Sequence, residues 1–361
     1  MEYGDRKSGP RLFLSLYLPS PGIRKALDYI VFFSPTTAIS KFPIDKFPFR
    51  GSYPYGLIDK KDQGYPRHSQ SYLFSNHHLV HQLLAAESKA VIVMPVAPYG
   101  DWSVFETREG LHRLLQECTL FLHREYLSTQ YASVRPSWPE YARAGGSVHL
   151  PTGMGAGVAS SIFARFEPVP PIARVAVAAF SSGCRALQSL LIKTTKFPEG
   201  FTKARFGMND TSVFEKVFQE VWDIDGAHSP YHGYAAFEMA LSNWYKDDRR
   251  FRLYHSQYTG GDHDSMLSEG LKHLRKPTDI VNDATVMDKD KGMSYWAKER
   301  HAANGRWSCV RFDNNFITSS GNPSDSHPQW KPSDPEGKNA HQFVPRIAFG
   351  HASYLFNKSQ S

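Results

Sequence analysis

Apolar residues occur along this chain as short runs that alternate with stretches of helical spacing. The runs are rich in β-branched and aromatic residues, and the early ones stop at proline, which marks the end of a strand. We predict strands at residues 11–18, 29–33, 90–94, 175–180, 217–224 and 251–258. Apolar positions spaced as one helix face follow the third strand, at Leu111, Leu114, Leu115, Cys118, Phe121 and Leu122. Strands that alternate with helices predict the α/β class, with a doubly wound, mostly parallel sheet.

Two long stretches depart from this alternation. Residues 41–76 are rich in Pro, Gly, Tyr and Phe, whereas residues 277–340 are polar, with many Asp, Asn, Ser and Pro. We interpret both as loop insertions in a single domain that spans residues 1–361. The first insertion is either a lid over a binding cleft or a loop without that role.

The segment 174–191 has the pattern of a buried strand, a sharp turn and a helix. Residues 175–180 are apolar without alternation, as in a strand covered on both faces. Ala179-Phe-Ser-Ser-Gly183 then fits the pattern small-x-Ser-x-small, a nucleophile elbow with alanine in place of the first glycine. Small residues are required there because the strand and helix backbones approach closely. Ser181 is the predicted nucleophile, since the bulk of Phe180 excludes the register centred on Ser182.

Composition and charge change this picture little. The chain has 361 residues, 41% of them apolar, and its net charge of +7 comes from Lys and Arg scattered among acids, so we predict no nucleic-acid partner. Cys118, Cys184 and Cys309 lack the spacing of a disulfide framework or a zinc site, and we predict no cofactor. Neither an apolar run of membrane-spanning length nor a secretion signal is present, so a cytoplasmic location is expected.

The order of elements over residues 11–356, with the elbow near the middle, resembles the α/β-hydrolase superfamily. Within it, Ser181-Ser-Gly-Cys-Arg-Ala-Leu and the later Asp225-Gly-Ala-His are similar to motifs of a branch of bacterial hydrolases. The resemblance implies a catalytic triad in the chain order serine, acid, histidine, with the acid after a later strand and the histidine near the C-terminus.

Asp225 is the candidate acid, because it stands where the predicted strand 217–224 ends. A carboxylate at the carboxyl end of a parallel strand faces the same sheet edge as the elbow. Asp223 lies on the same side but deeper in the strand. Asp262 and Asp264 follow the next predicted strand and are the alternatives, since many members of the superfamily carry the acid there.

His341 is the candidate base. Pro345 suits the first turn of a helix, so His341 is expected in the loop before it and His351 about two turns inside. A catalytic imidazole projects from a loop at the active edge, which favours His341 over His351, a residue that we expect in the core. His263 is a third candidate.

The resemblance also implies an oxyanion hole made of two backbone N–H groups. One belongs to Ser182, and the other comes from the loop after the strand 29–33. Pro35 has no N–H to donate, so we assign the second donor to Thr36.

Two other patterns could belong to nucleotide or metal binding. The glycine-rich run 153–157 matches neither of the glycine-rich motifs that bind the phosphates of nucleotides. Of His77, His78 and His81, the first and last have helical spacing but lack a third ligand, so we expect a solvent-facing or lid histidine cluster and predict no metal.

Taken together, the residues predict a serine hydrolase that cleaves a small-molecule ester, and an amide less readily, through an acyl-enzyme. The alternative is a catalytically silent binding protein with the same fold. Neither reading predicts an oligomeric state.

Overall fold

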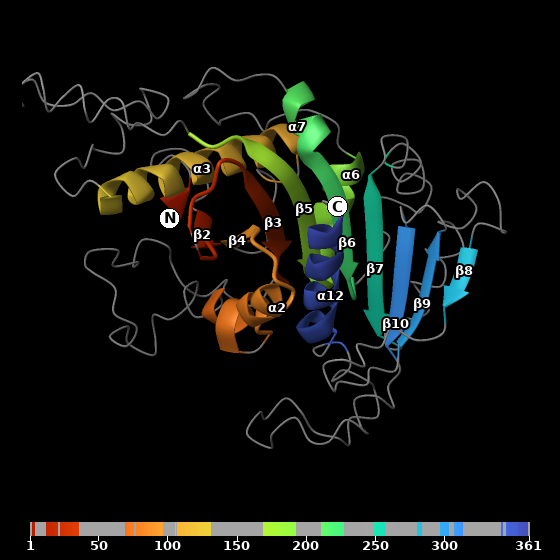
Figure 1. The fold of residues 1–361 in the computed structure, drawn as a ribbon. Coiled ribbons are helices and arrows are strands. Elements are labelled where there is room, and N and C mark those ends of the chain that lie inside the picture. The colour runs from red at the N-terminus through yellow and green to blue at the C-terminus, as the bar shows by residue number, and fades with distance from the viewer. Residues whose placement is uncertain are drawn as a thin grey trace, which may run out of the picture.

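A computed structural model of the chain describes residues 2–3, 12–20, 22–35, 69–75, 77–96, 105, 107–130, 169–192, 211–226, 244, 249–256, 280–283, 297–302, 307–312, 341 and 344–359. These residues form one twisted sheet with helices on both of its faces (Figure 1). The predicted α/β class is therefore confirmed. None of the helices in these ranges combines the length and the apolar character needed to cross a membrane.

Ten strands make up the sheet, in the order β1-β2-β4-β3-β5-β6-β7-β10-β9-β8. The six central strands β4, β3, β5, β6, β7 and β10 run parallel, and antiparallel pairs flank them at both ends. The strands are β1 Glu2–Tyr3, β2 Leu12–Tyr17, β3 Leu27–Phe33, β4 Val91–Val96, β5 Ile172–Phe180, β6 Phe218–Ile224, β7 Arg250–Ser256, β8 Ile280–Asp283, β9 Ala297–Ala302 and β10 Trp307–Phe312. The parallel centre brings the carboxyl ends of β3, β5, β6 and β7 to one edge, where a parallel sheet binds ligands.

Strand β5 is central because both of its faces are apolar. Its odd-numbered residues from Val175 to Ala179 point into one hydrophobic core, and its even-numbered residues from Ala176 to Phe180 point into the other. This double burial explains the continuous apolar run of the strand, since a strand with one wet face would alternate.

Helices cover the two faces unequally. Apolar residues of α3 Arg108–Gln130, α6 Cys184–Ile192 and α7 Thr211–Val217 fill the core on one face. The other face is covered by α2 Leu79–Ala85 and α12 Pro345–Lys358, together with the π-helical turn η3 Ser71–Ser75 (Figure 1). The chain therefore brings its C-terminal helix back onto the face opposite α6.

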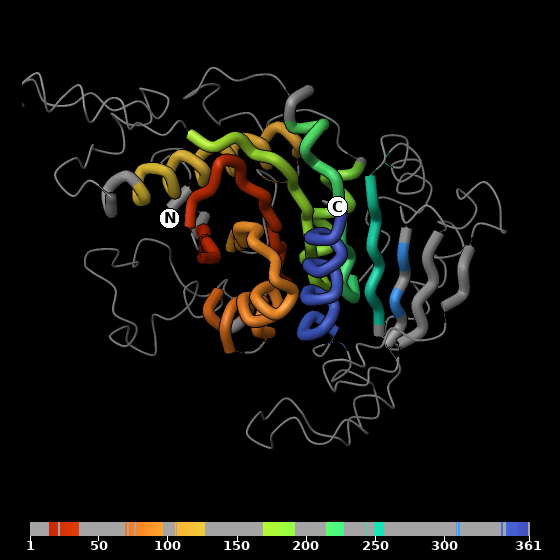
Figure 2. The backbone as a smooth tube through the Cα atoms, viewed as in Figure 1, coloured from red at the N-terminus to blue at the C-terminus, as the bar shows by residue number. Residues whose placement is uncertain are grey.

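The C-terminal helix α12 lies over β5 and β6, as Figure 2 shows for the blue helix and the green strands. Pro345 opens the helix, where its missing N–H costs nothing. Beneath the helix, β5 presents the small side chains of Ala176 and Ala178 on this face. Small residues at these positions let the helix approach the sheet closely.

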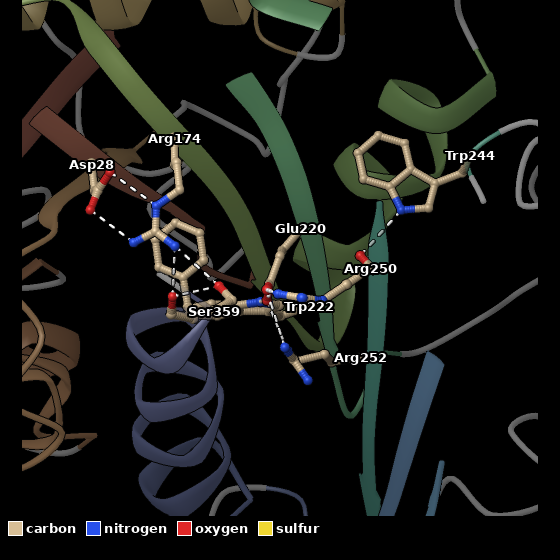
Figure 3. A network of polar contacts seen from close by, with 9 residues as sticks. Asp28, Arg174, Glu220, Trp222, Trp244, Arg250, Arg252 and Ser359 are labelled. Carbon is tan, nitrogen blue, oxygen red and sulfur yellow. Dashed lines mark hydrogen bonds and ion pairs between the residues drawn. The ribbon is translucent and has the colours of Figure 1, made fainter. Parts of the chain in front are cut away.

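Arg174 ties the end of α12 to the sheet. Its guanidinium forms a two-point ion pair with Asp28 on β3, at 2.9 and 3.2 Å, and donates to the Phe356 carbonyl at 2.8 Å and to the Ser359 hydroxyl at 3.1 Å (Figure 3). The same guanidinium stacks over the Phe356 ring, 4.2 Å from its centroid. One side chain thus joins two strands and the last helix.

A second buried ion cluster lies on β6 and β7. Glu220 accepts two hydrogen bonds from Arg252, at 2.8 and 3.1 Å, one from Arg250 at 3.2 Å and one from the Trp222 indole at 2.9 Å (Figure 3). Burial alone would raise the pKa of Glu220, but Arg252 and these donors outweigh it and hold the pKa below its ordinary value. The carboxylate therefore stays charged inside the sheet.

Two of the loop predictions meet described residues. Within 277–340, where a polar insertion is predicted, the chain forms β8, β9 and β10, and β10 pairs in parallel with β7. The insertion prediction missed these strands, because polar strands at the end of a sheet lack the apolar runs by which strands are recognised. Of the segment 41–76, residues 69–75 are described, and Tyr72 and Leu73 are buried in the core beneath α2. The rest of that segment lies outside the described residues.

Candidate active site

Ser181 stands at the turn between β5 and α6. The preceding Phe180 is still extended, with φ −122° and ψ 137°, whereas Ser181 has φ +53°, the left-handed region that residues other than glycine rarely adopt. A short 3₁₀ turn, η5 Ser181–Gly183, then leads into α6. The predicted strand, sharp turn and helix are present, with Ser181 at the strained position.

Gly183 allows the turn to pack against the end of β3. A Cβ atom built on Gly183 would lie 2.5 Å from the Phe33 carbonyl oxygen and 2.8 Å from the Ser34 carbonyl oxygen. These are backbone atoms of a buried strand and cannot move aside. A hydrogen is therefore the largest substituent that this position accepts.

His341 lies directly ahead of α12, at the carboxyl edge of the sheet. Its Nε2 is 2.8 Å from the Ser181 Oγ, and its Nδ1 is 2.6 Å from the Asp225 Oδ2. The structure thus brings the three predicted residues into one hydrogen-bonded chain, although 160 residues separate the serine from the histidine. A carboxylate accepts the Nδ1 proton, which leaves Nε2 as the acceptor for the serine hydroxyl.

Asp225 follows the last residue of β6 and is completely buried. Its backbone is left-handed, with φ +49°, and its N–H donates to the Tyr254 carbonyl on β7 at 2.6 Å. A buried carboxylate must be paired, and the His341 ring supplies that partner. The neighbouring strand therefore holds the turn that aims the carboxylate at the imidazole.

Asp223, the carboxylate deeper in β6, contacts the turn after that strand and the first residue of α6. Its Oδ1 accepts the Gly226 N–H at 3.1 Å and lies 3.4 Å from the Cys184 Sγ. Burial and the nearby Asp223 carboxylate raise the pKa of the Cys184 thiol well above its ordinary value, so the thiol remains a donor. Asp223 braces the turn that carries Asp225.

The structure separates His351 from the nucleophile. His351 lies in the second turn of α12, where its Nδ1 is 3.0 Å from the Tyr254 hydroxyl. Burial, with a smaller contribution from Arg252, lowers its pKa to about 4. His351 is therefore neutral at neutral pH, and its partner is Tyr254.

Several other candidates fall where the chain is not described. Thr36, the predicted second oxyanion donor, lies outside the described residues, and so do Asp262, His263 and Asp264. Ser182, the predicted first donor, follows the nucleophile within the 3₁₀ turn.

A chain of packed rings on the α12 face leads to the imidazole, and no sequence pattern predicted it. The Phe180 ring lies 4.7 Å from the His341 ring with an interplanar angle of 33°. His77 is 5.6 Å from Phe180, and Tyr72 stacks on His77 at 4.3 Å. In the sequence, Phe180 only excluded the elbow register centred on Ser182. Its even-numbered position along β5 is the signal that could have placed it on the face covered by α12.

The histidines near α2 form the expected solvent-facing cluster only in part. His77 precedes the helix and is buried, whereas His78 and His81 are exposed, with their rings 5.6 Å apart. Throughout the described ranges, no group of three or more His, Cys, Asp or Glu side chains is arranged to hold a metal ion.

No family model of known proteins matches this chain, and no curated protein sequence matches it. The chemical interpretation of the site therefore depends on its geometry. A hydroxyl, an imidazole and a buried carboxylate in this arrangement can transfer the hydroxyl proton to the ring and stabilise the charge that the ring acquires.

Proposed function

We propose that this protein is a serine hydrolase of the α/β-hydrolase type that cleaves a carboxylic ester. The observation that carries the proposal is the His341 ring, whose two nitrogens lie 2.8 Å from the Ser181 oxygen and 2.6 Å from the Asp225 oxygen. Neither surface exposure of the serine nor packing of the histidine accounts for an imidazole that contacts both a serine hydroxyl and a buried carboxylate.

In the proposed reaction the Ser181 oxygen attacks the ester carbonyl carbon while His341 Nε2 takes the hydroxyl proton. The tetrahedral intermediate then collapses, and the imidazolium returns that proton to the departing alcohol, which leaves an acyl group on Ser181. A water molecule repeats the two steps, with His341 again as base and then as acid, and releases the carboxylic acid. Asp225 stays ionised and stabilises the imidazolium each time.

Two features of the chain support the hydrolase type. The serine follows the central strand β5, the acid follows the adjacent strand β6, and the histidine comes last, ahead of α12, which is the order of the superfamily. The backbone strain at Ser181 is the strain that a nucleophile elbow requires. Ser182 and Thr36 are our candidates for the two oxyanion donors.

A fluorophosphonate probe tests the proposal, since it labels only serines that a base activates. We expect the wild-type protein to be labelled and Ser181→Ala to be unlabelled. Ser353→Ala, which removes another buried hydroxyl from α12, is the control and should label like wild type. Nitrophenyl esters of increasing acyl length should be hydrolysed by the same variants that are labelled. An unlabelled wild-type protein would point to the silent binding protein instead.

The roles of the base and the acid are tested on the same assay. His341→Ala and Asp225→Asn should each lower kcat by about three to four orders of magnitude, because the hydroxyl loses its base or the imidazole its orientation. His351→Ala and Asp264→Asn, at the two rival positions, should keep kcat within a small factor of wild type. If His351→Ala or Asp264→Asn abolishes turnover, that residue takes the role we assign to His341 or Asp225.

A further inference from the structure

The two hydrogen bonds of His341 do not by themselves oppose every motion of its ring. Ser181 and Asp225 hold the ring at its two nitrogens, on opposite sides. The ring can still rock about the line that joins these nitrogens, and it can swing on its side-chain bonds toward solvent, since 15% of the side chain is exposed. A flat apolar surface against one ring face would oppose both motions.

Phe180 provides such a surface. Its ring lies 4.7 Å from the imidazole and is tilted by 33°, within the range of favourable aromatic pairs. Phe180 is itself fully buried, and its backbone belongs to β5, paired in parallel with β6 at Ile224. The surface against the imidazole is therefore part of the rigid sheet.

Phe180 also packs against a second ring. The His77 ring contacts Phe180 at 5.6 Å with an interplanar angle of 62°, and Tyr72 stacks on His77 at 4.3 Å. We call Tyr72, His77 and Phe180 the aromatic wall. It connects the segment before α2 to the ring that reaches Ser181.

We propose that Phe180 is a positioning residue for the His341 imidazole, held in place by the rest of the aromatic wall. The inference depends on the proposed hydrolase function for its kinetic consequence, although the ring contact does not. The Phe180 ring lies 4.7 Å from the imidazole, within the distance at which an aromatic ring attracts a cation, so in this proposal it also favours the imidazolium that forms during the reaction.

The matched control is Phe214 on α7. Like Phe180 it is fully buried and packs against a histidine ring, that of His112 at 5.2 Å and 24°, but it lies in the core on the opposite face of the sheet. Phe180→Leu and Phe214→Leu therefore remove the same atoms from similar surroundings. A loss caused only by poorer packing appears in both variants.

We expect Phe180→Leu to lower kcat and the rate constant of fluorophosphonate labelling about tenfold, the size of one aromatic contact. KM for a nitrophenyl ester should change much less, because ground-state binding does not use the imidazole. Phe214→Leu should lose comparable thermal stability and keep the wild-type rate constant. Equal rate constants in Phe180→Leu and wild type, or an equal loss in both variants, would overturn the inference.

Proton NMR gives a readout that does not need turnover. The proton between His341 Nδ1 and Asp225, identified by its absence in His341→Ala, should resonate far downfield in wild type because its hydrogen bond is short and charge-assisted. We expect this resonance to broaden in Phe180→Leu and to stay sharp in Phe214→Leu. If wild type is never labelled while this difference is seen, the proposed function fails and the positioning role stands.

If Phe180→Leu does not fold, Phe180→Met replaces it in the kinetic and NMR experiments, because methionine is apolar and flexible but has no aromatic ring. An Overhauser contact between the Phe180 and His341 ring protons in the wild-type protein is required in every case. Its absence overturns the inference without any variant.

Discussion

At the scale of single residues, the site concentrates backbone strain on the two groups that flank the imidazole. Ser181 and Asp225 have φ values of +53° and +49°, and each such residue costs about 1 to 3 kcal/mol, which the surrounding structure must offset. Both stand at the carboxyl ends of adjacent strands, β5 and β6. His78 and Glu87 also have positive φ, but they flank the ends of α2, where a chain commonly reverses. The strain at the sheet edge is therefore tied to the hydrogen-bonded chain.

The buried His351 should make the stability of the protein depend on pH. Its pKa is about 4 in the folded protein and about 6.5 when exposed, so the unfolded chain takes up the proton first as the pH falls. This contribution to the free energy of unfolding is complete above about pH 6.5 and declines toward pH 4, by up to about 3 kcal/mol.

Denaturant unfolding of wild type and His351→Gln between about pH 7 and pH 4 measures this contribution. Glutamine does not titrate but can still accept the Tyr254 hydroxyl. The difference between the two proteins should change across that window in the stated direction. Parallel pH profiles would mean that the buried imidazole is not the group that titrates.

At the scale of elements, the active edge depends on how closely the turn into α6 approaches β3. Gly183→Ala should abolish labelling and destabilise the fold by more than about 2 kcal/mol, because the new methyl group meets two backbone carbonyls. Gly350→Ala is the comparison within α12, since its methyl group would lie 3.2 Å from the Gln82 Oε1 and 3.3 Å from the Gln82 Cβ, atoms of a side chain rather than of the backbone. That variant should destabilise the fold much less than Gly183→Ala and should still be labelled. Thermal melts and probe labelling of both variants provide the comparison.

The elbow could be predicted from the sequence because its requirements are local. An apolar strand, small residues at 179 and 183 and a following helix all lie within 20 residues. Asp225 could be predicted because it directly follows a strand whose carboxyl end lies at the active edge. His341 could be predicted because Pro345 marks the start of a helix and places the histidine in the loop before it. The aromatic wall was not predicted because His77 and Phe180 meet only after two helices and a sheet have packed, and no local pattern encodes that contact.

At the scale of the whole molecule, α12 is held near both of its ends by side chains from distant parts of the chain. Gln82 on α2 donates to the Pro345 carbonyl at 2.9 Å and accepts the Gly350 N–H at 2.7 Å. Arg174 binds the far end through Phe356 and Ser359. The helix therefore has one register on the sheet, and His341, just ahead of it, has one position at the active edge.

Arg174→Met should loosen the far end of α12 without moving its first turn. The substitution leaves the largely buried Asp28 without the Arg174 ion pair, which costs about 3 to 5 kcal/mol when such a pair is broken on one side. Hydrogen exchange should quicken in the last turn of α12, while the labelling rate constant of the folded protein stays near wild type. Lys216→Met, which removes an exposed cation on α7, should change neither quantity. We thus expect the two ends of α12 to behave independently. A labelling rate constant that falls as hydrogen exchange in the last turn quickens would contradict this expectation.

The extent of the sheet was the part of the whole molecule that the sequence did not reveal. β9 reads Ala-Lys-Glu-Arg-His-Ala, which has no apolar alternation, and it becomes a strand through its pairing with β10 and β8. Such strands are stabilised by partners far along the chain, so their own residues carry little signal. The parallel strands β3, β4 and β5 are different, because burial on both faces of the sheet marks them as nearly continuous apolar runs.

The separation of Ser181 from His341 along the chain also has a consequence for biosynthesis. The ribosome makes the serine 160 residues before it makes the imidazole that meets it. During that interval the hydroxyl is chemically ordinary, even if the turn around it has already formed. In the proposed hydrolase, Ser181 therefore gains its base only after the C-terminal part of the chain has been made and α12 has docked, so we expect an unfinished chain to leave esters intact.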